Sequence, residues 1–81
     1  MNEEEIRQVI LRILKRIAPE SDPNALTPDQ NIRNTLDIDS FDALSFFIAI
    51  DVELGVTVPE SDYGKLNTIS QIIQYLSRRL S

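Results

Sequence analysis

Residues 36–54, LDIDSFDALSFFIAIDVEL, decide the fold of this 81-residue chain, because an acidic start leads directly into apolar side chains at helical spacing. The spacing predicts a helix from Ser40 to Leu54. Ser40 lies at its start, between Asp39 and Asp42. The unpaired backbone N–H groups and partial positive charge of a helix N-terminus favour a negative group there, such as a covalently attached phosphate. Ser40 is therefore the first candidate functional residue, and an ordinary N-cap is the alternative.

The predicted central helix carries two apolar stripes. At about 100° per residue, one broad face should turn toward the core: Ala43, Phe46, Phe47, Ala49, Ile50 and Leu54. The second stripe lies on roughly the opposite face and consists of Phe41, Leu44, Ile48 and Val52. Ser45 and Asp51 lie beside it. Surface helices usually have one apolar stripe. We therefore expect the second stripe to bind partners, with burial on both sides, as in a homodimer, as the alternative.

A first helix is predicted over residues 3–17, where one face is apolar: Ile6, Val9, Ile10, Ile13, Leu14 and Ile17. Asn2 and Glu5 have the spacing of a capping box. Residues 19–38 have the composition of a loop. We expect four apolar side chains to fix this long loop to the core: Ala25, Leu26, Ile32 and Leu36.

The segment after the central helix is shorter and less regular. Gly55 is the expected helix stop, and residues 56–59 form a short extended link. Residues 60–66 form at best a short helix. Thr68, with Gln71 three residues later, predicts the start of a last helix. Its apolar stripe is Ile69, Ile72, Ile73, Leu76 and Leu80.

Composition argues against an enzyme. The chain has no cysteine and no histidine, so disulfides and the commonest general base and metal ligand are all missing. Its length fits one domain over residues 1–81. The chain shows neither a secretory signal nor an apolar run long enough to span a bilayer. We expect a cytoplasmic protein without membrane insertion.

Negative charge is concentrated in the middle of the chain, which has a net charge of −5. Residues 37–62 contain no basic residue and seven acidic ones: Asp37, Asp39, Asp42, Asp51, Glu53, Glu60 and Asp62. Such a surface would steer basic partner proteins and is a poor partner for nucleic acid. The alternative is an ordinary solvated surface.

Two other interpretations of the aspartates fail. A calcium loop starting at Asp37 would need an oxygen ligand at its fifth position and glycine at its sixth, where Phe41 and Asp42 stand. Loose binding of divalent cations by the clustered carboxylates stays open, although we expect no dedicated metal site. Asp37 and Asp39 also have the spacing of the paired aspartates of some phosphatases, but those enzymes need a large Rossmann-like domain.

The order of parts resembles the acyl carrier protein family. Asp39-Ser40-Phe41 follows a first helix and a long loop, and it is followed by an acidic helix, a Val58-Pro59-Glu60 link and a Thr68-capped last helix. The resemblance covers nearly the whole chain. It implies an all-α fold, a small four-helix bundle. Three of the helices are long, the third in chain order is short, and a long loop connects the first two.

The resemblance also implies a function. In that family the serine of this motif carries a 4′-phosphopantetheine arm, which a phosphopantetheinyl transferase adds from coenzyme A. The arm's thiol holds acyl intermediates as thioesters for fatty acid, lipid or polyketide-type enzymes with basic docking surfaces. Carried over, Ser40 is the attachment site of a monomeric carrier, and its partner-binding residues are Asp39, Phe41, Asp42, Leu44, Ile48, Asp51 and Val52. The competing class is a helical interaction module that is never modified, against which the intact Asp39-Ser40 argues.

The chain departs from the family pattern at four positions. Asp37 stands where glycine is common, and Ser45 and Val52 stand where fatty-acid carriers often have an acidic residue. Phe41 replaces the usual leucine. The partner-facing helix is thus less acidic and more apolar, which favours a specialised over a housekeeping carrier. Peptidyl carriers usually have glycines before the serine, which residues 37–39 lack.

Overall fold

Three long helices form the frame of the computed structural model, which describes residues 1–80. They are α1 (Glu3–Ile17), α3 (Ser40–Leu54) and α4 (Ile69–Leu80). A four-residue helix, α2 (Ile32–Thr35), and two 3-10 helices, η1 (Pro23–Ala25) and η2 (Glu60–Lys65), lie in the connections. Residues 1–80 contain no strand, so the prediction of an all-α helix bundle is confirmed.

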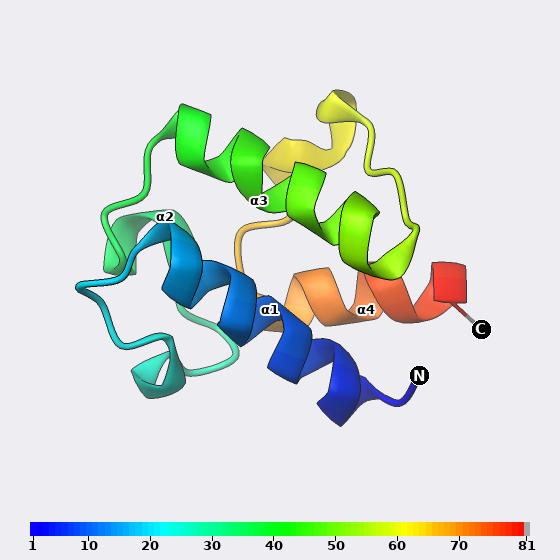
Figure 1. Cartoon of the computed structure of the whole chain (residues 1–81), viewed down its shortest axis with the longest axis horizontal. Helices are drawn as coiled ribbons and strands as arrows, with labels where there is room; N and C mark the ends of the chain where they lie inside the picture. The colour runs from blue at the N-terminus through cyan, green and yellow to red at the C-terminus, as the bar shows by residue number, and fades with distance from the viewer. Residues whose placement is uncertain (81) are drawn as a thin grey trace.

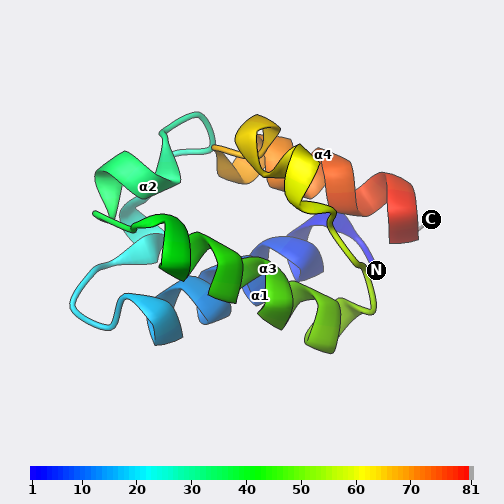
Figure 2. The same ribbon diagram turned by 90° about the horizontal axis from the view of Figure 1, so that it is seen from above.

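Helix α1 begins at the predicted capping box. The Glu5 N–H donates to Asn2 Oδ1 at 2.8 Å, and the Asn2 N–H donates to Glu5 Oε1 at 3.0 Å. The apolar stripe of α1 is buried, apart from the half-buried Ile17, and Leu11 joins it. This helix packs against both α3 and α4. Figures 1 and 2 show that α3 and α4 run in the direction opposite to α1.

The segment between α1 and α3 is more ordered than the predicted loop. It contains η1 and α2, whose short hydrogen-bonded turns leave no periodic apolar stripe in the sequence. Leu26 and Ile32 are buried and Leu36 is half-buried, as expected, but Ala25 is exposed and does not fix the loop to the core. The Ile32 N–H donates to the Asn67 carbonyl at 2.8 Å, which ties α2 to the residues before α4.

The C-terminal half follows the predicted order. Gly55 ends α3 with φ 69°, a left-handed conformation that glycine adopts without strain. Residues Glu60–Lys65 form the 3-10 helix η2. At the start of α4 the capping box is present: Gln71 N–H donates to Thr68 Oγ1 at 3.1 Å, and Thr68 N–H donates to Gln71 Oε1 at 3.2 Å.

The two stripes of α3 face different surroundings. Phe46, Phe47 and Ile50 are buried in the core. The other members of the core face are half-buried: Ala43, Ala49 and Leu54. The second stripe is exposed, with exposed fractions of 74% for Phe41, 40% for Leu44, 56% for Ile48 and 81% for Val52. Within this chain, α3 is therefore buried on one side only.

Candidate functional site

Asp39, not Ser40, caps α3. Asp39 Oδ1 accepts a hydrogen bond from the Asp42 N–H at 2.9 Å, and Asp39 itself has extended backbone geometry. Ser40 is the first residue of the helix and is exposed. Because Asp39 provides the cap, the Ser40 hydroxyl is left available for chemistry, and the ordinary N-cap interpretation of Ser40 is wrong.

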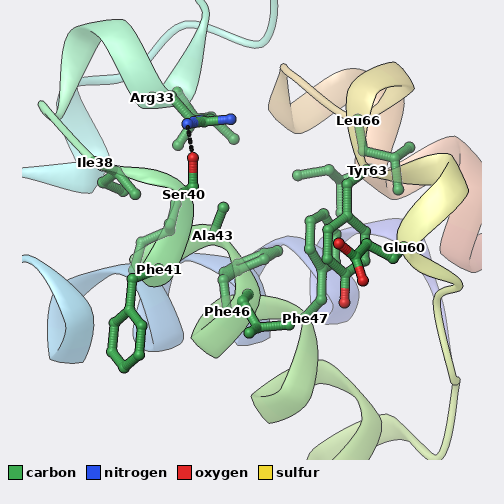
Figure 3. A pocket seen from close by; sticks show the side chains of 14 residues that line it. Arg33, Ile38, Ser40, Phe41, Ala43, Phe46, Phe47, Glu60, Tyr63 and Leu66 are labelled. Carbon is green, nitrogen blue, oxygen red and sulfur yellow. Dashed lines mark hydrogen bonds between the residues drawn. The ribbon is translucent and has the colours of Figure 1, made fainter.

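Arg33 is the basic neighbour of Ser40. Its Nη2 donates to Ser40 Oγ at 3.1 Å, as the dashed line in Figure 3 shows. The sequence pattern did not indicate this contact, because Arg33 lies on the unpredicted α2, seven residues before Ser40. One signal was present: Arg33 is the only basic residue between Arg16 and Lys65.

Asp37 has a left-handed backbone conformation, with φ 55°. It is the only non-glycine residue with positive φ among residues 1–80. Glycine adopts this conformation without strain, and aspartate tolerates it better than most residues. The backbone thus gives a physical reason why glycine suits this place, and it turns the chain into α3 three residues before Ser40.

A cavity of about 540 Å³ opens beside Ser40. Its walls are mostly apolar and come from every α-helix and from η2: Leu14, Ile32, Ile38, Phe46, Phe47, Tyr63, Leu66 and Ile72 are among them. Ser40 and Arg33 line it on one side, and Tyr63 and Glu60 lie across from them in Figure 3. The rings of Phe47 and Tyr63 stack with centroids 4.3 Å apart.

Fewer acidic side chains are free to bind partners than the sequence suggested, because several of them bond to other residues of the chain. Glu53 accepts from Arg12 at 2.7 Å and from Arg16 at 2.9 Å, which joins α3 to α1. Asp51, predicted to bind partners, is half-buried and accepts from Thr57 Oγ1 at 3.0 Å. The carboxylates nearest Ser40 in sequence carry no ion pair within residues 1–80: Asp37, Asp39 and Asp42.

The half-buried Asp62 is also bonded to another side chain of the fold. Tyr75 Oη donates to Asp62 Oδ2 at 2.6 Å, and this bond joins η2 to α4. The hydrogen bond from Tyr75 lowers the pKa of Asp62 below its ordinary value, and Lys65 and Arg79 add to the effect. Burial and the bond to Asp62 raise the pKa of Tyr75. Asp62 is therefore a structural carboxylate.

The site offers a nucleophile without catalytic partners. The group bonded to the Ser40 hydroxyl is a guanidinium, which stays protonated and cannot act as a base. Residues 1–80 contain no group of three or more side chains suited to a metal ion. Over the same residues, no helix is both long and apolar enough to cross a membrane. An exposed hydroxyl at a capped helix start is suited to receiving a group.

Comparisons with known proteins agree with this geometry. Residues 4–76 match the family model described as "Phosphopantetheine attachment site". The chain is similar to the acyl carrier proteins of Rickettsia canadensis and Rickettsia rickettsii, each 35% identical over 60 residues, which cover 74% of this chain and 70% of the relative. A Schizosaccharomyces pombe protein, named provisionally as a mitochondrial acyl carrier protein, is 28% identical over 69 residues, or 85% of this chain and 62% of its own.

The helical fold and the match of residues 4–76 to the phosphopantetheine attachment model define a carrier domain. The chain belongs to the acyl carrier protein family and contains its phosphopantetheine attachment domain. Members of this family are non-catalytic carriers that work with phosphopantetheinyl transferases and acyl-processing enzymes, so the predictions of family, cofactor and absence of enzyme activity are confirmed.

Proposed function

We propose that Ser40 is the attachment site of the phosphopantetheine arm. The observation that carries the proposal is the exposed Ser40 hydroxyl at the first position of α3. This hydroxyl is not needed to cap the helix, because Asp39 does so. In the transfer, a bond forms between Ser40 Oγ and the phosphorus that bears pantetheine. The pyrophosphate bond of coenzyme A breaks and adenosine 3′,5′-bisphosphate departs with the bond's electron pair, while the hydroxyl proton passes to a base of the transferase.

The holo protein would present acyl thioesters to fatty acid, lipid or polyketide-type enzymes. Asp39 and Asp42 would meet basic residues of the partner. Apolar contact would come from the exposed stripe of α3: Phe41, Leu44, Ile48 and Val52. Asp51 would contribute at the edge of this surface, and the mostly apolar cavity beside Ser40 suits an apolar part of the cargo. The apolar stripe favours a specialised carrier.

The proposed working form is a monomer in the cytoplasm. Charged rims mainly set association rate and specificity, whereas a few apolar anchors supply most of the affinity. A small stripe with acidic neighbours suits brief contacts with a series of enzymes, and an acidic surface suits protein partners better than nucleic acid.

Intact mass spectrometry tests the attachment site. After incubation with coenzyme A and a broad-specificity transferase, the wild-type chain should gain the mass of one phosphopantetheine, and Ser40→Ala should gain none. Ser61→Ala is the matched control, because Ser61 is exposed and flanked by Glu60 and Asp62 in η2. Equal labelling of Ser40→Ala would refute the assignment, and no labelling of the wild type would favour the unmodified interaction module.

A further inference from the structure

Arg33 is the cation that contacts the Ser40 hydroxyl. It forms no ion pair within residues 1–80, and its side-chain hydrogen bond goes to Ser40 Oγ. Four other cations pair with carboxylates: Arg7, Arg12, Arg16 and Lys65. Lys15 donates to backbone carbonyls, and Arg79 lies 3.5 Å from the centroid of the Tyr75 ring. The Arg33 guanidinium thus contacts the Ser40 hydroxyl and has no carboxylate of residues 1–80 within ion-pair distance.

Three hydrogen bonds fix the backbone around Arg33. The Arg33 carbonyl accepts from the Ile38 N–H at 2.9 Å, which closes the turn into α3. The preceding residue, Ile32, is buried, and its N–H donates to the Asn67 carbonyl at 2.8 Å. Asn31 Oδ1 accepts from the Asn34 N–H at 3.0 Å and caps α2. The guanidinium therefore extends from an anchored position beside the start of α3.

We infer that Arg33 holds the phosphate of the arm, an inference that rests on the assignment of Ser40 as the attachment site. Arg33 Nη2 lies 3.1 Å from the oxygen that would become the ester oxygen. In the phosphodiester the two non-bridging oxygens lie one bond beyond the phosphorus, within reach of a guanidinium in this position. Arginine binds phosphate through paired, charge-assisted hydrogen bonds, and it does so better than lysine.

The consequence is a fixed direction for the root of the arm. Arg33 and Ser40 line the same side of the cavity, at the point where α2 meets the start of α3. A phosphate held by Arg33 starts the arm at this opening, on the α2 side of Ser40 (Figure 3). Arg33 is thus a positioning residue, because it acts on the phosphate and leaves the thiol chemistry to the arm.

Phosphorus NMR of the holo protein tests the contact. Wild type, Arg33→Gln, Arg33→Lys and Arg7→Gln are loaded with coenzyme A and transferase, and intact mass confirms one arm on each. Arg7 is the matched control, because it lies in the N-terminal half of α1, at the end of the fold opposite to the start of α3 (Figures 1 and 2). At low salt, the signal of Arg33→Gln should shift from that of the wild type, with Arg33→Lys in between and Arg7→Gln unchanged.

Salt and melting temperature provide second readouts. Added salt should move the wild-type signal toward that of Arg33→Gln, because screening weakens exposed charge pairs. Attachment of the arm should raise the melting temperature more in the wild type than in Arg33→Gln.

Identical phosphorus signals in all four holo proteins would overturn the role of Arg33 and leave Ser40 assigned. Slower transfer with an unchanged signal would also overturn it, because Arg33 would then serve the transferase. No mass gain at Ser40 would overturn both assignments.

Discussion

Asp37 has the strained backbone conformation from which the chain enters α3. A left-handed conformation disfavours L-residues by about 1–2 kcal/mol, and β-branched side chains adopt it least readily. We expect Asp37→Gly to retain or raise the free energy of unfolding and Asp37→Val to lower it by about 1–2 kcal/mol. Chemical denaturation measures both changes. Asp29→Val is the control, since Asp29 is exposed in the same long segment and lacks positive φ; equal losses at both positions would contradict this explanation.

We expect Asp39 to have two roles, capping α3 and contacting the transferase, and two variants separate them. Asparagine caps a helix as well as aspartate does, whereas alanine removes the cap at a cost of about 0.5–2 kcal/mol. Asp39→Asn should therefore fold with near wild-type stability and accept the arm several-fold more slowly, most clearly at low salt. Asp39→Ala should lose stability as well. Transfer rates and thermal unfolding are measured on both, and normal transfer to Asp39→Asn would assign Asp39 a purely structural role.

At the residue scale, local signals were predictable and distant contacts were not. The motif at residues 39–42 indicated Ser40 because a helix start depends on neighbours within one turn. The contact of Arg33 with Ser40 depends on the path of α2, which is too short to leave a periodic pattern. The positive φ of Asp37 was likewise not predicted, although glycine at this place in the family was a hint.

At the scale of elements, α3 separates stability from recognition. Phe46 and Ile50 are 4% and 0% exposed, so Phe46→Ala or Ile50→Ala should lower the free energy of unfolding by roughly 2–5 kcal/mol. Ile48 and Val52 are exposed, so Ile48→Ala and Val52→Ala should change it little and weaken productive contact with partner enzymes instead. Denaturant midpoints for the four variants measure this. Equal losses at Ile48 and Ile50 would contradict a partner-binding role of the stripe.

The contact between η2 and α4 gives the fold a defined pH dependence. The Tyr75 hydrogen bond lowers the pKa of Asp62 in the folded protein. The ionised Asp62 therefore stabilises the fold fully above pH 3.8, the ordinary aspartate value, and this contribution to stability is lost as pH falls through the lowered pKa. The pKa of Tyr75 is raised, so its contribution is present below pH 10.0 and is lost as pH rises through the raised pKa. The stability difference between wild type and Tyr75→Phe should be constant between about pH 5 and 9 and should narrow outside that range. Thermal unfolding across pH measures it, and a difference independent of pH would contradict this role.

At the scale of the whole molecule, periodic elements were predictable and their connections were not. Apolar spacing and capping boxes placed α1, α3 and α4, because each of these helices has a continuous stripe to bury. Besides its local turns, α2 is tied to a distant part of the chain by the hydrogen bond from Ile32 to Asn67, and η1 packs against α1. The cavity arises where the four α-helices, η2 and the linker residues Ile38 and Leu66 converge, so no single stretch of sequence encodes it.

The exposed stripe of α3 also decides the expected oligomeric state. Stable dimers bury about 800 Å² per partner over some 20–30 residues a side, whereas this stripe consists of four side chains on one helix. We therefore expect a monomer whose denaturant midpoint is independent of protein concentration. Val52→Glu, at the most exposed position of the stripe, should leave the midpoint unchanged at every concentration. A midpoint that rises with concentration in the wild type and stops rising in Val52→Glu would instead show a homodimer formed through this stripe.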